Sequence, residues 1–157
     1  MRKKIIREWK KVYESDLQYI AYELKDLADT PSVILLNGRI GSGKTTFAKR
    51  FIKDGDTFSP SYSVLSETRN VLHADLYRIE NREEIIHIEL PLYLESKQYF
   101  LVEWGEKYLT TIYKETPEDY SYYNLDITIN KSIDTNESKP DQNFSRNFIL
   151  SEISEID

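Results

Sequence analysis

Apolar residues in the first part of the chain recur at two spacings, one typical of helices and the other typical of buried strands. From residue 15 they return every three or four positions, which predicts an amphipathic helix that stops before Pro31. Ser15, with Gln18 three residues later, fits a capping box at the start of this helix. The apolar stripe consists of Leu17, Ile20, Ala21, Leu24, Leu27 and Ala28. The next segment, SVILLN at 32–37, is continuously apolar up to its last residue, which predicts a central parallel strand buried on both faces.

Helices and apolar strands continue to alternate along the rest of the chain. Helices are predicted over 44–53, over 81–96 with an end at Pro91, and over 106–115. Strands are predicted over 62–67 and 70–77 as a hairpin, over 98–104, and over 124–130 and 146–152 as a final pair. We expect the polar segment 131–145 to be mobile. The alternation predicts one α/β domain over 1–157, a three-layer sandwich whose mixed sheet has a parallel core and antiparallel C-terminal edge strands.

Composition narrows the classes of protein that fit. The chain has 157 residues, of which 39% are hydrophobic and 31% charged, and this balance indicates a globular domain large enough to bury a core. It contains no cysteine, which excludes disulfides, thiolate zinc sites and cysteine catalysis. No apolar run approaches the roughly 20 residues that a membrane helix needs, and the basic start has no apolar signal-peptide core, so we expect no membrane and a cytoplasmic location.

Charge is distributed unevenly. The net charge is −6, although the first eleven residues carry six Lys or Arg and one Glu, so the remainder of the chain is strongly acidic. The net negative charge of the rest of the chain argues against a protein that binds nucleic acid by electrostatic attraction alone. The basic start could contact an acidic partner, but we favour an edge strand whose lysines prevent unwanted strand pairing.

Three of the five glycines fall within six residues, directly after the predicted central strand. The stretch Gly38–Thr45 fits G-x-x-x-x-G-K-[ST], the phosphate-binding loop (P-loop). Glycines let the backbone turn its N–H groups toward anionic oxygens, and the helix that follows presents its unpaired N–H groups. Lys44 would reach the β- and γ-phosphates, and the Thr45 hydroxyl would bind Mg²⁺. The predicted nucleotide-binding residues are Gly38, Arg39, Ile40, Gly41, Ser42, Gly43, Lys44 and Thr45.

Two acidic residues stand at the ends of predicted strands. Asp75 ends VLHAD and Glu103 ends YFLVE. If both strands flank 32–37 in parallel, the two carboxylates point at the phosphates, because ligands of open α/β sheets bind at the carboxyl ends of the strands. Each residue taken alone could be a solvated strand end. Next to a P-loop, we predict that they help to hold Mg²⁺ and to position a water. His73 could assist Asp75 or the γ-phosphate, or could serve packing and hydrogen bonding.

The nucleotide is predicted to be ATP, and three classes of function remain. Guanine-reading motifs are missing: NKSID at 130–134 places its aspartate one position late for N-K-x-D, and no glycine follows an aspartate by three residues. An ATPase is the leading hypothesis. The alternatives are a P-loop small-molecule kinase and a nucleotide-switched binding module in which hydrolysis is incidental.

Four stretches occur in an order that resembles the TsaE family, formerly called YjeE: GRIGSGKTTF, SPSYSV, HADLYR and VEWGE. The resemblance spans roughly residues 14–109. It implies that Lys44 and Thr45 contact phosphate and Mg²⁺ and that Thr46 is a second threonine at the helix start. It implies catalytic roles for Asp75, near the attacking water, and for Glu103, linked to Mg²⁺. It also implies a switch-like loop near the γ-phosphate, formed by Ser59, Pro60, Ser61 and Tyr62.

The resemblance also implies an enzymatic activity and two partner proteins. TsaE proteins are small bacterial ATPases needed to make threonylcarbamoyladenosine in tRNA, and they work with TsaB and TsaD. The likeness therefore implies Mg²⁺-dependent ATP hydrolysis that is slow without those partners, and contact with tRNA only through the complex.

Overall fold

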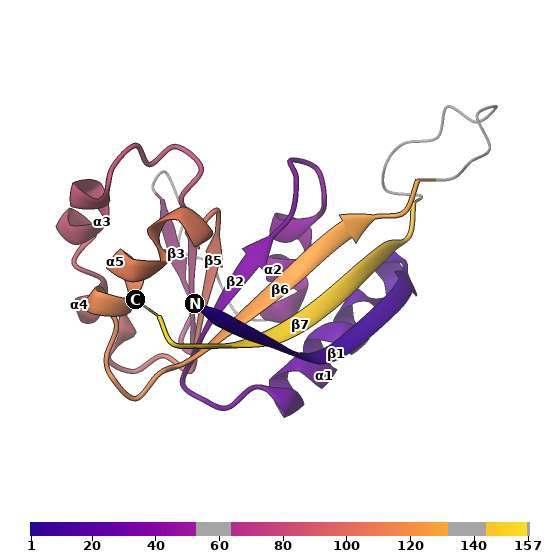
Figure 1. Ribbon diagram of the computed structural model, residues 1–157, viewed down its shortest axis with the longest axis horizontal. Coiled ribbons are helices and arrows are strands. Elements are labelled where there is room, and N and C mark those ends of the chain that lie inside the picture. Colours follow the sequence, from indigo (N-terminus) through magenta and orange to yellow (C-terminus); the bar gives the residue numbers. More distant parts are fainter. Residues whose placement is uncertain (53–63, 132–143, 157) are drawn as a thin grey trace.

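The computed structural model describes residues 1–52, 64–131 and 144–156. Its centre is a seven-stranded mixed sheet with the order β1-β7-β6-β2-β5-β4-β3 (Figure 1). The strands are β1 (Arg2–Val12), β2 (Ser32–Asn37), β3 (Leu65–Glu67), β4 (Val71–Asp75), β5 (Tyr99–Glu103), β6 (Ser121–Ile129) and β7 (Arg146–Ser154). Parallel pairing joins β6, β2, β5 and β4, whereas β3, β7 and β1 pair antiparallel with their neighbours. The predicted mixed sheet with a parallel core is confirmed.

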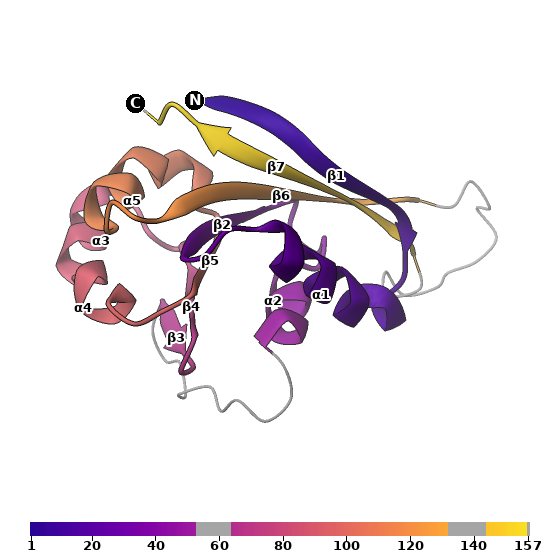
Figure 2. The ribbon, with the colours of Figure 1, turned by 90° about the horizontal axis from the view of Figure 1, so that it is seen from below.

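Helices cover both faces of the sheet, which confirms the three-layer sandwich. The helices are α1 (Leu17–Leu27), α2 (Lys44–Ile52), α3 (Arg82–Ile88), α4 (Leu90–Leu94) and α5 (Leu109–Glu115), with 3-10 turns at Glu14–Asp16 and Glu106–Tyr108. Figure 2 shows α1 and α2 on one side of the strands and α3, α4 and α5 on the other. The predicted hairpin is also present, as β3 and β4.

The central strand β2 shows why this arrangement is stable. Its side chains alternate between the two layers of helices: Ile34 and Leu36 belong to the core that includes α1 and α2, and Val33 and Leu35 to the core under α3, α4 and α5. All four side chains are fully buried. Because both faces of this strand are buried, neither set of alternate side chains meets water. Its sequence is therefore a nearly continuous apolar run and does not alternate between apolar and polar residues.

The two ends of the chain together build the side of the sheet beyond β6. The basic N-terminus forms β1, the outermost strand, which confirms the edge-strand interpretation. Trp9 and Val12 of β1 are buried, whereas all its lysines are exposed. Of the two C-terminal strands, only β7 is antiparallel to its neighbours, because β6 pairs parallel with β2 and extends the parallel core. Most residues of β6 are buried, as expected of an inner strand.

Two local predictions about helix ends are wrong. The capping box at Ser15 and Gln18 does not form, because a 3-10 turn precedes α1 and Asp16 accepts a hydrogen bond from the backbone N–H of Tyr13 at 2.9 Å. Pro91 does not end the helix over 81–96. That break lies at Glu89, whose φ of 60° is left-handed, and Pro91 stands in the first turn of α4, where its missing N–H costs no hydrogen bond.

The glycine turn connects β2 to α2 and depends on its glycines in different ways. Gly41 and Gly43 have φ angles of +82° and +105°, a region that side chains disfavour. Gly38 is restricted by its surroundings instead: a Cβ at this position would lie 2.8 Å from the backbone oxygen of Ile127 in β6. The loop therefore packs against the sheet at Gly38, and it changes direction at Gly41 and Gly43 through left-handed backbone conformations.

We expect the alanine variants of these glycines to differ in stability. Gly41→Ala adds only backbone strain, about 1 kcal/mol, since nothing lies within 4 Å of the added methyl group. Gly38→Ala forces the loop away from β6 and should cost about 2–3 kcal/mol. Urea unfolding measures both free energies, with the exposed α2 variant Lys49→Ala as the control. A Gly41→Ala cost equal to or above that of Gly38→Ala would contradict this account of the loop.

A second prediction concerns Tyr120, which precedes β6. Its buried hydroxyl donates a hydrogen bond to the backbone oxygen of Leu94 at 2.8 Å, and burial together with the nearby Asp119 charge raises its pKa from 10.0 to about 12. Because the folded state favours the protonated phenol, this stabilisation is complete below pH 10 and is lost as pH rises toward 12. Tyr120→Phe should therefore lower the free energy of unfolding at pH 7 by about 1 kcal/mol and flatten its decline at alkaline pH.

Urea unfolding at pH 7 and at pH values above 10 tests this, with Tyr22→Phe as a control because Tyr22 is exposed. An unchanged alkaline slope in Tyr120→Phe would show that Tyr120 is not the group responsible.

Candidate functional site

A cavity of about 680 Å³ lies at the carboxyl ends of β4 and β5, beside the glycine turn. It brings together many of the residues predicted from the sequence: Ile40, Gly41, Gly43, Lys44, Thr45, Thr46, Asp75 and Glu103. Gly38, Arg39 and Ser42 are not on its wall. Gly38 and Ser42 face the protein interior, and Ser42 is 2% exposed. The predicted switch residues Ser59, Pro60, Ser61 and Tyr62 lie outside the described residues.

Lys44, the first residue of α2, has its ammonium group held against the loop. Nζ donates hydrogen bonds to the backbone oxygens of Gly38 at 2.5 Å and Arg39 at 3.1 Å, and it lies 3.9 Å from the centre of the Trp104 ring. Burial lowers the pKa of Lys44, while the negative charges of Glu103 and Asp75 act in the opposite direction. The lysine has only neutral partners at bonding distance here, and a phosphate oxygen would be a stronger, charged acceptor.

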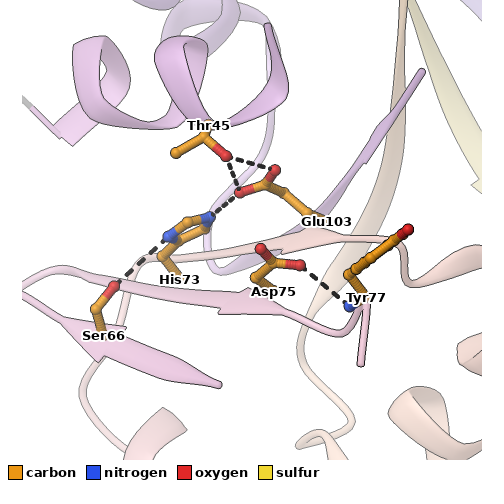
Figure 3. A network of polar contacts seen from close by, with 6 residues as sticks. All are labelled: Thr45, Ser66, His73, Asp75, Tyr77 and Glu103. Atoms are coloured by element: carbon orange, nitrogen blue, oxygen red, sulfur yellow. Dashed lines mark hydrogen bonds and ion pairs between the residues drawn. The ribbon is translucent and has the colours of Figure 1, made fainter. Parts of the chain in front are cut away.

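Glu103 is the buried centre of a polar network that joins three elements (Figure 3). Its carboxylate, 2% exposed at the end of β5, accepts hydrogen bonds from the Thr45 hydroxyl at 2.9 and 3.1 Å. Nε2 of His73 lies 2.6 Å from Oε2 of this carboxylate, the oxygen that also accepts the 3.1 Å bond from Thr45. Nδ1 of His73 lies 3.5 Å from the hydroxyl of Ser66 in β3. The network thus links α2, β5 and the β3–β4 hairpin around one charge.

Asp75 lies beside this network and remains exposed. It is the last residue of β4 and pairs in register with Glu103, so both acids occupy the same edge of the sheet (Figure 3). One of its oxygens accepts a hydrogen bond from the backbone N–H of Tyr77 at 3.1 Å (Figure 3). The expectation that both strands flank 32–37 is correct for β5 alone, because β4 is one strand further out. Both carboxylates nevertheless line the cavity.

The donor set suits Mg²⁺. Thr45, Asp75 and Glu103 offer only oxygen atoms, which Mg²⁺ prefers, and the cation keeps several waters and takes phosphate oxygens as further ligands. Within residues 1–52, 64–131 and 144–156, no group of three or more His, Asp or Glu side chains is placed to hold a metal ion. The oxygen atoms of Thr45, Asp75 and Glu103 are compatible in kind with a cation that takes its remaining ligands from water and phosphate.

Sequence reasoning left the role of His73 open and missed other residues of the site. His73 contacts Glu103 and not Asp75, which is the hydrogen-bonding alternative, although the strand register places His73 opposite Leu101 and Asp75 opposite Glu103. Arg146, at the start of β7, donates hydrogen bonds from Nε to the backbone oxygen of Ser42 at 2.5 Å and from a terminal nitrogen to that of Gly41 at 3.4 Å. The wall also includes Trp104 and residues at the junction of β1 and α1. Nothing in the local sequence around Arg146 signals its position, which follows from the topology of the sheet.

Among the described helices, none is both long enough and apolar enough to cross a membrane.

Comparisons with known proteins agree with the geometry. The chain is 31% identical over 83 residues to a tRNA threonylcarbamoyladenosine biosynthesis protein TsaE of Haemophilus influenzae, a match that covers 48% of this chain and 52% of that protein. It is 34% identical over 90 residues to the TsaE protein of Rickettsia typhi, covering 50% and 62%. With the TsaE protein of Bacillus subtilis, it shares 31% identity over 106 residues, covering 62% and 66%. The matches thus span between half and two thirds of these relatives.

A solved structure and a family model extend the similarity to most of the chain. The crystal structure of Bacillus subtilis YdiB superposes with a TM-score of 0.50, covering 98% of this chain and 89% of that one, and its 21% identity supports the fold alone. The model of the family described as Threonylcarbamoyl adenosine biosynthesis protein TsaE matches residues 12–139. The chain therefore belongs to the TsaE family.

Proposed function

We propose that this protein binds ATP with Mg²⁺ and hydrolyses it as part of the machinery that makes threonylcarbamoyladenosine in tRNA. The observation that carries the proposal is the convergence of Lys44, Thr45, Asp75 and Glu103 on one cavity at the mouth of a glycine-rich loop. The names of the relatives support the assignment to this pathway, and the arrangement of these side chains supports the binding and hydrolysis of a nucleotide.

Each residue has a task in this proposal. The loop N–H groups and the Lys44 ammonium would bind the β- and γ-phosphates, with Lys44 exchanging backbone oxygens for charged ones. Thr45 and Glu103 would hold Mg²⁺. The bound cation would neutralise the negative charge that develops on the phosphate oxygens. His73 would fix the orientation of Glu103 through their 2.6 Å contact. Asp75, the exposed acid, would orient the attacking water.

The proposed partners are TsaB and TsaD, and the proposed location is the cytoplasm, where bacterial tRNA is modified. The acidic charge of the chain supports contact with tRNA only through the complex, because phosphate backbones repel an acidic surface. Measuring ATP hydrolysis with and without the two partners tests this assignment. We expect slow turnover alone and a clear increase with the pair; no increase would contradict the proposed partners.

Lys44→Ala should abolish the stabilisation of the protein by Mg-ATP. The wild type should melt at a higher temperature with millimolar Mg-ATP, since a ligand that binds only the folded state stabilises it. Lys49→Ala removes an equal charge from the exposed side of the same helix and should retain the full shift in melting temperature. Equal shifts in wild type and Lys44→Ala would refute the phosphate assignment.

Asp75→Asn should separate binding from hydrolysis. The amide keeps the size of the side chain but loses the charge that orients the water, so we expect Mg-ATP binding within about threefold of wild type and hydrolysis at least about 100-fold slower. Phosphate release and calorimetric titration measure the two effects. Full hydrolysis by Asp75→Asn would remove Asp75 from the mechanism, and a stable phosphorylated small molecule in place of free phosphate would favour a kinase.

A further inference from the structure

The carbonyl groups of the glycine turn need hydrogen-bond partners of their own. A loop that turns its N–H groups toward phosphates leaves carbonyl oxygens on its other side, and such oxygens are costly to bury without donors. Two cations from different parts of the chain bond these oxygens: Lys44 bonds those of Gly38 and Arg39, and Arg146 bonds two that follow. In the proposed function, Lys44 leaves its two oxygens for a phosphate, so Arg146 holds the turn while the nucleotide is bound.

The position of the Arg146 side chain is fixed from several directions. Its three guanidinium nitrogens each donate to a backbone oxygen: Nε to Ser42 at 2.5 Å, one terminal nitrogen to Gly41 at 3.4 Å and the other to Phe144 at 3.1 Å. The group is planar and rigid, so three bonds along its edges set its orientation. The backbone at residue 146 is held as well, because β7 lies between β1 and β6 and this residue is paired with both strands.

The turn has a glycine at the place where the guanidinium group approaches it. A Cβ on Gly43 would lie 3.2 Å from Nε and 3.7 Å from Cδ of Arg146, and the first distance is shorter than an ordinary van der Waals contact. Gly43 thus meets two requirements, since it also has a φ angle of +105°. The glycine of the turn and the arginine of β7 are therefore matched in shape, although they are distant in sequence.

The bond to Ser42 also strengthens a donor of the turn. The carbonyl of Ser42 and the N–H of Gly43 belong to one peptide group and point in opposite directions. A cation bonded to the oxygen polarises this group, which makes its N–H a stronger hydrogen-bond donor. Gly43 lines the cavity in which the phosphates are proposed to bind. Arg146 can therefore act on a bound polyphosphate through a peptide group, without contacting the phosphates itself.

We propose that Arg146 is a positioning residue for the polyphosphate: it holds the carbonyl groups of Gly41 and Ser42 and so keeps the N–H groups of the turn oriented for binding. The inference rests on the proposed function, since it takes the same ligand and assigns a residue that orients its binding loop. Residue 146 lies outside the segment 12–139 that the TsaE family model matches. The C-terminal strand β7 would thus contribute to the site from beyond that segment.

The test compares a nucleotide with a ligand that consists of phosphates alone. Calorimetric titration gives the dissociation constants of Mg-ATP and of magnesium tripolyphosphate for wild type, Arg146→Met and Arg146→Lys. Arg146→Met keeps an unbranched side chain but has no donor, so it should weaken both ligands by the same factor, about tenfold. Arg146→Lys keeps the charge but loses the planar fork, so it should recover part of this loss and bind both ligands about threefold more weakly than wild type.

Arg2→Met is the matched control, because it removes the same charge from the far end of the β1–β7 pair. The side chain of Arg2 is 74% exposed and forms an ion pair with Glu155. This variant should change neither dissociation constant, which separates the local effect of Arg146 from the effect of net charge.

The backbone amide resonances of the glycines provide a second readout in the ligand-free protein. Those of Gly41 and Gly43 should shift in Arg146→Met, because the carbonyls next to them lose their donor. The resonance of Gly105, which packs against Val102, should stay unchanged. A variant that was damaged throughout would move all three.

Two binding results would overturn the positioning role while the phosphate site stands. The first is a loss confined to Mg-ATP, or no loss at all, in Arg146→Met. The second is binding of both ligands by Arg146→Lys at wild-type strength, which would show that a charge suffices without the fork. If melting of the ligand-free protein shows that Arg146→Met does not fold, Arg146→Lys carries the test. If neither ligand binds wild type, the proposed function falls and this inference falls with it.

Discussion

The arrangement of the site depends on one buried charge. Glu103 is 2% exposed, and a carboxylate in such a place is tolerated only when its oxygens have hydrogen-bond donors. Here the donors come from α2, through Thr45, and from β4, through His73. Satisfying this charge therefore fixes the start of α2 against the ends of two strands. The same contacts place a hydroxyl and a carboxylate next to each other at the mouth of the glycine turn, where a metal bound to phosphate would need them.

The central strand explains why that charge can be held in place. A strand whose side chains are buried in both cores leaves little freedom for β2 to shift in register. Its parallel neighbours share its direction, so the ends of β2 and β5 stay level, with Leu36 opposite Glu103. The loop that leaves β2 consequently begins at the same level as the acid that α2 must meet. Apolar packing thus sets the position of a polar site, although none of these apolar residues takes part in it.

Much of this could be predicted from the sequence, because the relevant signals are local. The run SVILLN, the glycine pattern after it and the acids at strand ends are each contained within a few residues, and each was located correctly. What could not be predicted depends on pairing between distant segments. His73 reaches Glu103 diagonally, since the pairing of β4 with β5 places Asp75 opposite Glu103 and His73 opposite Leu101, and no feature of either segment alone encodes that register. Likewise, β6 joins the parallel core because it pairs with β2, and Arg146 reaches the glycine turn from β7, the next strand beyond β6.

The charge of the protein shows how such a site can serve an anionic ligand. The chain has a net charge of −6, and three carboxylates, those of Glu14, Asp75 and Glu103, line the cavity, so the overall field repels a triphosphate. In the proposed function, attraction would then come from short-range groups: the N–H groups of the loop, the Lys44 ammonium, whose pKa is lowered by burial, and a bound metal ion. The carboxylates that oppose a bare nucleotide favour one that carries Mg²⁺, since they can share the cation with the phosphates. In the proposed function, the acidic cavity therefore selects the metal complex of the nucleotide over the free anion.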